Sequence, residues 1–257
     1  MRLEVQGEGL PWRRGFLGLE LWCVDLKAGA ASLLTLERQT ARLPKRDWDF
    51  ASTIADTRRA GEWLAAHVAL RILLERAVGP KWRGTPFVRG AGVKPYLAGA
   101  PVTFSLSHVS GWSLVGVGSG EYVGVDLERA RCMNIREPRR VMLQRAAAAL
   151  SEETSLPERE DLRTLQAWVR LEAFAKADGR GIGRLLTQLG IVGSTSAQDV
   201  GFCKRLDEVK KGPPACKVHD LDIAAGVFAA AALPLTARPP AIFKFPSSIS
   251  GIHELLS

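Results

Sequence analysis

The chain has 257 residues, of which 46% are apolar and 24% charged, and its formal net charge at pH 7 is +8. Such a composition is typical of a soluble globular protein that can bury a sizeable core, as one large domain or two small halves, and no apolar run is long enough for a membrane span. The positive charge favours an acidic partner: nucleic acid, a phosphorylated small molecule or an acidic protein.

Cysteine usage and the first residues indicate a compartment. The four cysteines lie far apart without a framework spacing, and the start of the chain lacks the basic-then-apolar layout of a signal peptide. We therefore expect a reduced, cytoplasmic protein. Cys203, Cys216 and His219 could be imagined as a zinc site, but no fourth ligand falls at a usual spacing.

The first part of the chain predicts a strand followed by helices. Residues 1–16 are Gly-rich and predict irregular structure, and a strand is expected over Leu17–Leu26, ended by Gly29. A helical stretch over 31–41 and a polar turn precede a longer helix over 54–77, which Gly79-Pro80 stops. A Gly- and Pro-rich connection then covers residues 81–101.

Three short strands are expected next, over 102–106, 112–117 and 122–127, joined as a meander by residues 107–111 and 118–121. The segment from Arg129 to Arg145 carries six arginines and one acid, Glu137, and leads into an Ala-rich helix that ends near Leu150. This basic segment is either a solvated surface or a docking face for an acidic partner.

A polar loop over 151–160 precedes a helix over 161–176, with Gly179 just past its end. The remainder predicts a strand-rich part that includes strands over 216–221 and 224–233, the second apolar throughout and so buried. The Pro-rich tail from Pro234 is expected to be poorly ordered.

Two acidic residues share one face of the strand over 122–128. Residues two apart on a strand point the same way, so Tyr122, Gly124, Asp126 and Glu128 lie on one face and the valines and Leu127 on the other. Asp126 and Glu128 are either ordinary solvent-facing acids or two ligands of one divalent cation. Carboxylates and water suit Mg²⁺, a hard cation that prefers oxygen ligands.

The helix over 161–176 carries charges in an unexpected place. Its apolar stripe contains Leu162, Leu165, Trp168 and Val169, while Arg163, Gln166 and Arg170 form the polar stripe roughly opposite. Glu172 and Lys176 fall inside the apolar stripe. A surface Glu–Lys pair would lie on the polar stripe. An inward carboxylate and ammonium each need a partner, which a site for a cation and an anionic substrate would supply.

Two further motifs are ambiguous by themselves. Ser107-His108 does not lie in the Gly-x-Ser-x-Gly context of a hydrolase, so His108 is either a satisfied loop histidine or a ligand-binding residue. Gly179-Arg-Gly-Ile-Gly183 follows a helix instead of opening one, which indicates helix termination and a tight turn, not a phosphate loop.

Four motifs in register resemble the 4′-phosphopantetheinyl transferases of the two-half, surfactin-synthetase-activating type. They are Val-Lys-Pro-Tyr-Leu at 93–97, Phe-Ser-Leu-Ser-His at 104–108, Gly-Val-Asp-Leu-Glu at 124–128, and Trp168-x-x-x-Glu-Ala-x-x-Lys176 running into Gly179-x-Gly181. Each motif is weak alone, but their order and intervals together are specific, and weaker similarity extends over most of the chain.

The resemblance implies transfer of phosphopantetheine from coenzyme A to a serine of an acyl, peptidyl or aryl carrier protein. It implies an α+β fold of two similar halves packed as a pseudo-dimer, here residues 1–115 and 116–257, in a monomer with no membrane or nucleic-acid partner. Asp126, Glu128 and Glu172 would ligate Mg²⁺, and Glu172 would help to deprotonate the serine. Lys176 would offset charge on the leaving 3′,5′-ADP. Lys94, Pro95, Ser107, His108 and Lys176 would hold coenzyme A, and the arginines of 129–145 would dock the acidic carrier.

Four positions depart from the family pattern. Leu171 stands where a lysine is usual, Val93 replaces a glycine, Val109 follows the Ser-His pair, and His67 stands where many relatives have an arginine. These changes leave open a relative that binds coenzyme A or carriers without turnover. A basic nucleic-acid-binding protein is a further alternative, although no nucleic-acid motif supports it.

Overall fold

The computed structural model describes residues 3–6 (backbone only), 18–90, 93–119, 122–151, 157–192, 201–212, 215–235 and 241–257. The chain forms two compact units. Unit 1 comprises Met1–Glu4, Gly90–Lys94 and Tyr122–Pro239, and unit 2 comprises Val5–Arg89, Pro95–Glu121 and Pro240–Ser257. The units differ from halves 1–115 and 116–257 mainly at the chain ends. Helices and a largely antiparallel set of strand pairs occur in both, which confirms the α+β class.

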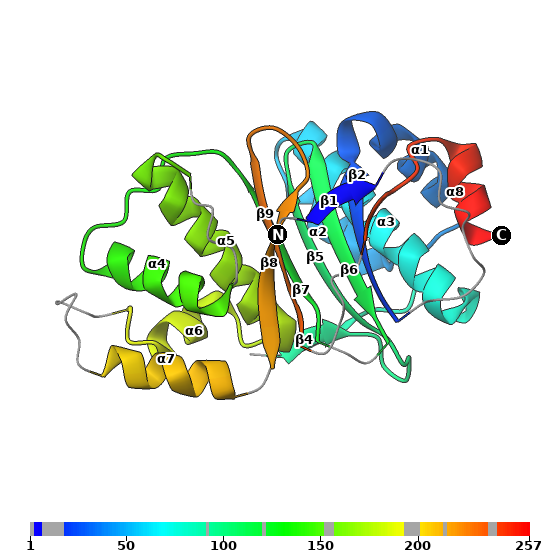
Figure 1. Cartoon of the computed structure of the whole chain (residues 1–257). Coiled ribbons are helices and arrows are strands. Elements are labelled where there is room, and N and C mark those ends of the chain that lie inside the picture. The colour runs from blue at the N-terminus through cyan, green and yellow to red at the C-terminus, as the bar shows by residue number, and fades with distance from the viewer. Residues whose placement is uncertain are drawn as a thin grey trace. The chain divides into compact units, whose positions relative to one another are not determined.

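Unit 2 contains a sheet with helices against it. The sheet has the order β5(Thr103–Val109)-β6(Trp112–Gly118)-β2(Leu19–Asp25)-β10(Ile242–Lys244), and the last residues of β1(Leu3–Gln6) pair parallel with β10. Its helices are α1(Leu26–Gln39), α2(Lys45–Ser52), α3(Thr57–Val78), η1(Pro80–Trp82) and α8(Ile249–Leu256). Helix α3 contacts α1, α2, α8, β5 and β6, so it is the central helix of this unit (Figure 1).

Local capping shifts two boundaries from the predicted ones. The strand expected over 17–26 ends at Asp25, and the helix expected from residue 31 begins at Leu26. The reason is that the Asp25 carboxylate accepts the backbone N–H groups of Lys27 and Ala28 and so starts α1. Helix α2 occupies the expected polar turn. The stop at Gly79 is confirmed: its φ of 88° and its N–H bond to Glu75 end α3.

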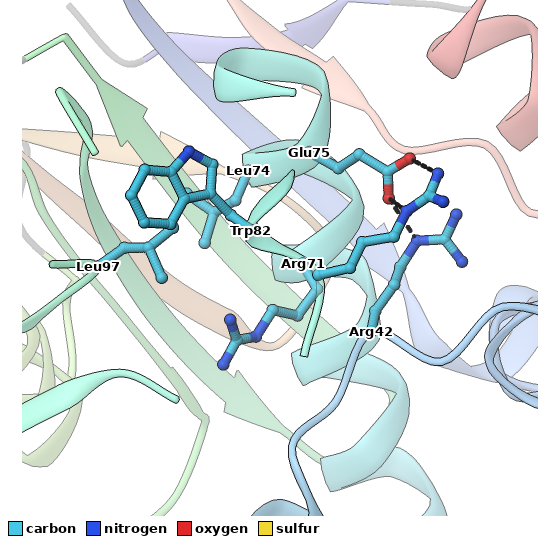
Figure 2. Close-up of a pocket in the computed structure, with 7 residues that line it drawn as sticks. Arg42, Arg71, Leu74, Glu75, Trp82 and Leu97 are labelled. Atoms are coloured by element: carbon cyan, nitrogen blue, oxygen red, sulfur yellow. Dashed lines mark hydrogen bonds and ion pairs between the residues drawn. The ribbon is translucent and has the colours of Figure 1, made fainter. Parts of the chain in front are cut away.

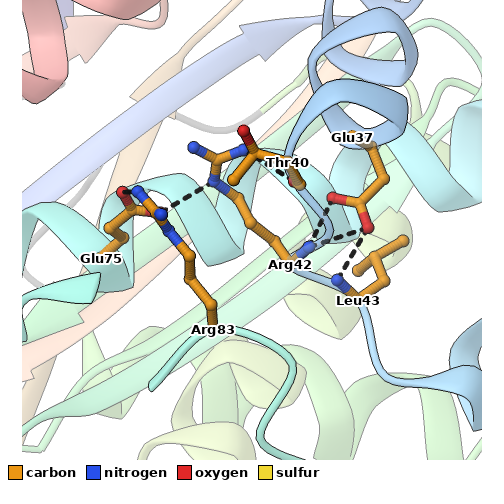
Figure 3. Close-up of polar contacts among 6 residues, drawn as sticks. All are labelled: Glu37, Thr40, Arg42, Leu43, Glu75 and Arg83. Atoms are coloured by element: carbon orange, nitrogen blue, oxygen red, sulfur yellow. Dashed lines mark hydrogen bonds and ion pairs between the residues drawn. The ribbon is translucent and has the colours of Figure 1, made fainter. Parts of the chain in front are cut away.

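Buried ion pairs tie the loops of unit 2 to α3. The Glu75 carboxylate accepts from Arg42 Nε at 2.8 Å and from the Arg83 guanidinium, while Glu37 accepts the backbone N–H groups of Arg42 and Leu43 (Figure 3). Burial raises the pKa of Glu37, against the lowering effect of those N–H bonds. These bonds hold the segments on either side of α3 in one geometry.

Two further predictions are corrected. The connection over 81–101 contains a two-stranded sheet, β3(Val88–Gly90) with β4(Val93–Tyr96). The tail expected to be poorly ordered from Pro234 instead forms β10 and α8, because Ile242, Phe245, Ile252 and Leu255 are buried in the unit 2 core. Residues 236–240 of that tail lie outside the described residues, as does most of the segment 1–16.

Unit 1 has the sheet order β8(Cys216–Asp222)-β9(Val227–Pro234)-β7(Gly124–Arg129), with the first residues of β1 parallel to β8. Its helices are α4(Arg139–Leu150), α5(Glu160–Asp178), α6(Ile182–Gln188) and α7(Phe202–Lys211). Helix α5 contacts all three strands and also α4 and α6 (Figure 1). The C-terminal part is thus less strand-rich than predicted. None of the described helices in either unit combines the length and hydrophobicity that a bilayer crossing requires.

The predicted meander holds only for its first pair. Strands β5 and β6 are antiparallel neighbours, but β7 pairs with β9, near the C-terminal end of unit 1 in the sequence, and not with β6. The prediction assumed that strands that follow each other in the sequence form hairpins. Strand β7, however, belongs to unit 1, where its hydrogen-bond partner is β9. Tyr122, expected in the strand, precedes it and is exposed.

The predicted polar stripe of the central helix in unit 1 is wrong. Helix α5 is enclosed on nearly all sides, and Gln166 and Arg170 are 3% and 1% exposed. A 3.6-residue period distinguishes polar from apolar side chains, but it does not reveal that a buried polar side chain has a partner on another element. Here that partner is Asp220 on β8.

Candidate active site

Strand β7 brings the two predicted carboxylates onto the face that α5 covers. Asp126 is 4% exposed, and the Glu128 side chain is 28% exposed nearer the strand end. Gly124, on the same face, allows this packing: a Cβ atom there would lie 2.0 Å from the Ala173 carbonyl oxygen and 2.5 Å from the Ala177 nitrogen. The backbone of α5 therefore rests directly on β7 beside Asp126.

Helix α5 places Glu172 and Lys176 against those carboxylates. The Lys176 Nζ atom lies 2.6 Å from Asp126 Oδ1 and 3.9 Å from Glu172 Oε1. The side chains of Glu172 and Lys176 are 25% and 28% exposed, so both are half-buried and accessible from solvent. Most of their neighbours on α5 are more deeply buried, so the two charges lie on the more exposed side of the helix, with the Lys176 ammonium between the carboxylates of Asp126 and Glu172.

The electrostatics of Glu172 suit a proton acceptor. Burial raises the pKa of the Glu172 carboxyl, and the negative charges of Asp126 and Glu128 raise it further, while Lys176 lowers it. A carboxylate whose pKa is raised holds a proton more readily, which is what a general base needs near neutral pH. Asp126 and Glu128 are thus near enough to act on Glu172 electrostatically.

Glu128 has a second partner at the start of the Arg-rich segment. Its carboxylate lies 3.3 Å from Arg131 Nη2 and 3.4 Å from Arg131 Nε. Arg131, Arg136, Arg139 and Arg145 are exposed, whereas Arg140 is engaged by Glu137 and Glu160. The basic segment of 129–145 therefore begins directly beside the carboxylate group.

The carboxylates of Asp126 and Glu172 are of the ligand type that a magnesium ion prefers. Within the ranges that the structure describes, no three His, Cys, Asp or Glu side chains converge closely enough to form a ready metal site. Asp126 and Glu172 nevertheless already flank a positive charge, the Lys176 ammonium, and all their donor atoms are hard oxygens. An oxygen-binding cation fits these residues, with the ammonium marking where positive charge is favoured.

Lys94 also belongs to unit 1, and its ammonium is turned inward. It donates to the carbonyl oxygen of Val123 and, at 3.3 Å, to that of Ala177. Burial lowers the pKa of Lys94 to about 8, with Cys216 and Asp178 opposing the shift. Gly179, which ends α5 at φ 82°, packs against the Lys94 backbone: a Cβ atom there would meet the Lys94 nitrogen at 2.3 Å. The predicted turn at Gly179 is thus confirmed, and it has a second role as a contact surface.

The remaining predicted coenzyme residues lie in unit 2. Ser107 and His108 are in strand β5, not in the turn expected there, and the turn is formed by Ser110-Gly111. The His108 and His67 rings are 6.3 Å apart, and His67 stacks on Trp63 at 3.7 Å. Burial lowers the pKa of His67 to about 3, so this histidine is neutral at pH 7. Pro95 follows Lys94 at the point where unit 2 resumes.

Sequence reasoning missed an arginine cluster in unit 2. Arg71 is 4% exposed; its Nη1 donates to the Thr85 carbonyl at 2.7 Å and its guanidinium covers the Phe87 ring, but Nε and Nη2 have no partner among the described residues. Burial lowers the pKa of Arg71 to about 10. Figure 2 shows its guanidinium directed away from the Glu75 ion pairs. An anion bound here would supply acceptors for these two buried donors.

Arg71 has charged neighbours that belong to the same cluster. Burial raises the pKa of Asp47, and the positive charges of Arg71, Arg46 and Arg89 oppose that shift. One Asp47 oxygen is buried and has no hydrogen-bond partner among the described residues. The sequence contained a signal for this cluster. Arg71 is a charged residue inside the apolar run Val68–Leu74, just as Glu172 is a charged residue inside an apolar stripe.

His108 also lines an open pocket in unit 2. The pocket has a volume of about 330 Å³ and aromatic walls from Phe50 and Trp63, whose rings are 4.9 Å apart. Arg59, Glu62 and Ser110 supply its polar groups. Its size and its mixed lining are those of a small-molecule site.

The family departures have different structural settings. Leu171 is fully buried in the unit 1 core, so its side chain is not among the carboxylates. Val109 lines the unit 2 pocket next to His108. The side chain of Val93 lies outside the described residues.

Comparison with known proteins indicates the same family as the motifs. No family model matches the chain. A protein of Synechocystis sp. named "Putative 4′-phosphopantetheinyl transferase" is 31% identical over 134 residues, which cover 49% of this chain and 53% of that protein. The chain thus spans about half the length of this curated relative. The resemblance of this chain to the 4′-phosphopantetheinyl transferases is therefore confirmed by a curated relative as well as by its motifs.

Proposed function

We propose that this protein transfers 4′-phosphopantetheine from coenzyme A to a serine of an apo carrier protein, in a Mg²⁺-dependent reaction in the cytoplasm. The observation that carries the proposal is the group formed by Lys176, Asp126 and Glu172, in which an ammonium and two carboxylates meet in a half-buried position. The two units would correspond to the halves of the pseudo-dimeric family fold.

Each residue of this group has a place in the reaction. The carrier serine oxygen forms a bond to the phosphorus that bears the pantetheine arm, the bond from that phosphorus to the bridging oxygen breaks, and 3′,5′-ADP leaves. Glu172 accepts the serine proton, for which its raised pKa is suited. The Lys176 ammonium offsets the negative charge that develops on the leaving phosphate.

Asp126, Glu128 and Glu172 would hold the magnesium ion. When bound, such an ion neutralises phosphate charge and orients the pyrophosphate. The protein's own contribution is to keep Asp126 and Glu172 on two elements that Gly124 allows to pack closely. Lys176 would move from Asp126 toward the leaving phosphate as the substrate enters.

Coenzyme A would be held in part by unit 2. Arg46, Arg71 and Arg89 would supply positive charge for the phosphates, with Nε and Nη2 of Arg71 as the hydrogen-bond donors. The pocket at His108, with Ser107 next to it in β5, would supply aromatic faces for the adenosine. Pro95 would shape the turn after Lys94. The inward ammonium of Lys94 supports a role in holding the start of β7 to α5, beside any contact with phosphate.

The partner would be an acidic acyl or peptidyl carrier, of fatty acid, polyketide or nonribosomal peptide biosynthesis, met by a monomer of this chain. Arg131 lies beside Glu128, and the exposed Arg136, Arg139 and Arg145 that follow it in the chain would extend a complementary surface. The test is to incubate the purified chain with a panel of apo carriers, coenzyme A and Mg²⁺, and to weigh each carrier. A mass gain of one phosphopantetheinyl group is expected; no gain on any carrier, with folded protein, would refute the proposal.

A second candidate is a protein that binds coenzyme A without turnover. The direct Lys176–Asp126 pair favours it, because the ammonium occupies one of the predicted metal ligands. Calorimetry with coenzyme A separates the two: heat of binding without any carrier mass gain supports the second candidate.

A further inference from the structure

Helix α5 carries a buried ion pair, Arg170–Asp220, that has no role in the proposed reaction. Arg170 Nε and Nη2 lie 2.9 and 2.7 Å from the two oxygens of Asp220, and Gln166 Nε2 donates to Asp220 at 2.8 Å. The Arg170 and Asp220 side chains are only 2% and 3% exposed. Such a two-pronged pair is directional, because the planar guanidinium and the carboxylate must share one plane.

Asp220 and Asp126 lie in one row of the unit 1 sheet. Asp126 on β7 and Asp220 on β8 are both in register with Ala230 on the strand between them, so the three side chains point to the same face. Helix α5 meets both ends of this row: Lys176 pairs with Asp126, and Arg170 pairs with Asp220. The helix is thus attached to the sheet at two carboxylates separated by one alanine.

The other buried residues of α5 are apolar and of mixed size. Ala167, Ala173, Ala175 and Ala177 alternate with Leu165, Val169, Leu171 and Phe174, and apolar contacts of this kind are less directional than a two-pronged ion pair. A side-chain end lies about 5–6 Å from a helix axis, so a rotation of roughly 20° moves it by about 2 Å. Misplacement by about 1 Å can cost a reaction roughly 100-fold.

We propose that Arg170, through Asp220 and Gln166, is a positioning residue that sets the rotation of α5 and thereby aims Glu172 and Lys176 at the carboxylates of β7. The pair does not touch substrate. It lies on a different side of the helix from Glu172, two residues away, and transmits its constraint through the rigid α-helical backbone. This inference rests on the proposed function for its activity readout, but its structural readout does not.

The experiment compares Arg170→Met, Arg170→Lys and the double variant Arg170→Met/Asp220→Leu with the natural chain. A single loss leaves a buried charge unpaired and destabilises the protein, whereas the double variant replaces the pair with apolar side chains and can restore stability. Arg163→Met, on the same helix, is the matched control. Thermal unfolding and transfer kinetics are measured on each full-length variant.

A positioning role predicts that the double variant unfolds at the natural temperature but has a kcat lowered by about 10- to 100-fold, with the KM for coenzyme A changed less than about threefold. Arg170→Lys, which keeps the charge and loses the two-pronged geometry, should be intermediate in kcat. A double variant that recovers both stability and kcat would overturn the proposal.

A second readout needs no carrier and no turnover. Limited acetylation by acetic anhydride, followed by peptide mapping, measures how freely the Lys176 amine reacts. Rotation of α5 would release Lys176 from Asp126, so we expect several-fold faster acetylation in the double variant than in the natural chain or in Arg163→Met. Equal acetylation rates would overturn the positioning role. If the natural chain modifies no carrier while these rates differ, the proposed function fails and the positioning role stands.

Discussion

Lys176 Nζ lies 2.6 Å from Asp126 Oδ1, which joins the helix and the strand of the candidate site by a direct ion pair. The pair is partly open to solvent on the lysine side and closed on the aspartate side. Charge-assisted bonds of this kind are strong, and here the same two residues are also the ones that the proposed reaction needs. The pair thus joins α5 to β7, and in the proposed reaction the same two residues would take up chemical roles once substrate binds.

Removal of either carboxylate should stop transfer. We expect Asp126→Asn and Glu172→Gln to lower kcat by at least about 100-fold, because the first loses a metal ligand and the second loses both a ligand and the proton acceptor. Carrier mass gain against time measures this. Glu208→Gln, on the exposed face of α7, is the control. Near-natural rates in both site variants would contradict the assigned roles.

Arg71→Met should weaken coenzyme A binding by about tenfold or more. The buried Nε and Nη2 donors of Arg71 have no acceptor among the described residues, and a phosphate of coenzyme A would supply one. A hydrogen bond to a charged group contributes about 1.5–3 kcal/mol to the binding free energy. Calorimetry with coenzyme A measures the affinity, and Arg38→Met at the end of α1 is the control. Equal weakening in both variants, or in neither, would exclude a specific role for Arg71.

The exposed arginines should govern carrier recognition. We expect Arg136→Glu/Arg139→Glu to raise the carrier KM by roughly tenfold at low salt while the KM for coenzyme A stays unchanged, since like charges repel an acidic carrier. The difference should shrink as salt screens the charges. Lys210→Glu/Lys211→Glu on α7 makes the same charge change elsewhere in unit 1. An equal effect of this control would indicate net charge alone.

Gly124→Ala should destabilise unit 1 severely. The new Cβ atom would lie 2.0 Å from the Ala173 carbonyl, a backbone atom that cannot turn aside, so α5 must shift. We expect a loss of more than about 3 kcal/mol of unfolding free energy. Gly183→Ala in α6, where nothing lies within 4 Å, should instead be neutral or stabilising by up to about 1 kcal/mol. Urea titration of both variants measures the contrast.

His67 should make the protein sensitive to acid. Its pKa is about 3 in the fold against 6.5 as the ordinary value, so between these limits the unfolded chain binds a proton that the folded chain does not. Its contribution is fully present above pH 6.5 and is lost as the pH falls toward 3, by up to about 1.4 kcal/mol per pH unit. His67→Gln should flatten this slope in urea titrations, whereas the exposed His253→Gln should not. An unchanged slope in His67→Gln would exclude the neutral buried state.

Short-range patterns in the sequence determined several features of the fold and of the candidate site. The ends of the long helices α3 and α5 follow from Gly79 and Gly179, which alone adopt the left-handed backbone there at little cost. The spacing of Glu172 and Lys176 by four residues places them next to each other on one side of a helix, and the shared face of Asp126 and Glu128 follows from the alternation of a strand. These features depend on neighbours within a few residues, so a single sequence contains them.

The tertiary structure alone decided which distant residues meet. Nothing near Asp220 in the sequence indicates that it pairs with Arg170, 50 positions earlier, and periodicity assigned that arginine to the solvent. The partner of β7 is β9 and not the adjacent β6, and the tail after Pro240 is ordered because its apolar residues find the unit 2 core. Burial of a charge becomes acceptable only when a partner from another element is present, and pairing between distant elements is decided by the packing of the whole unit.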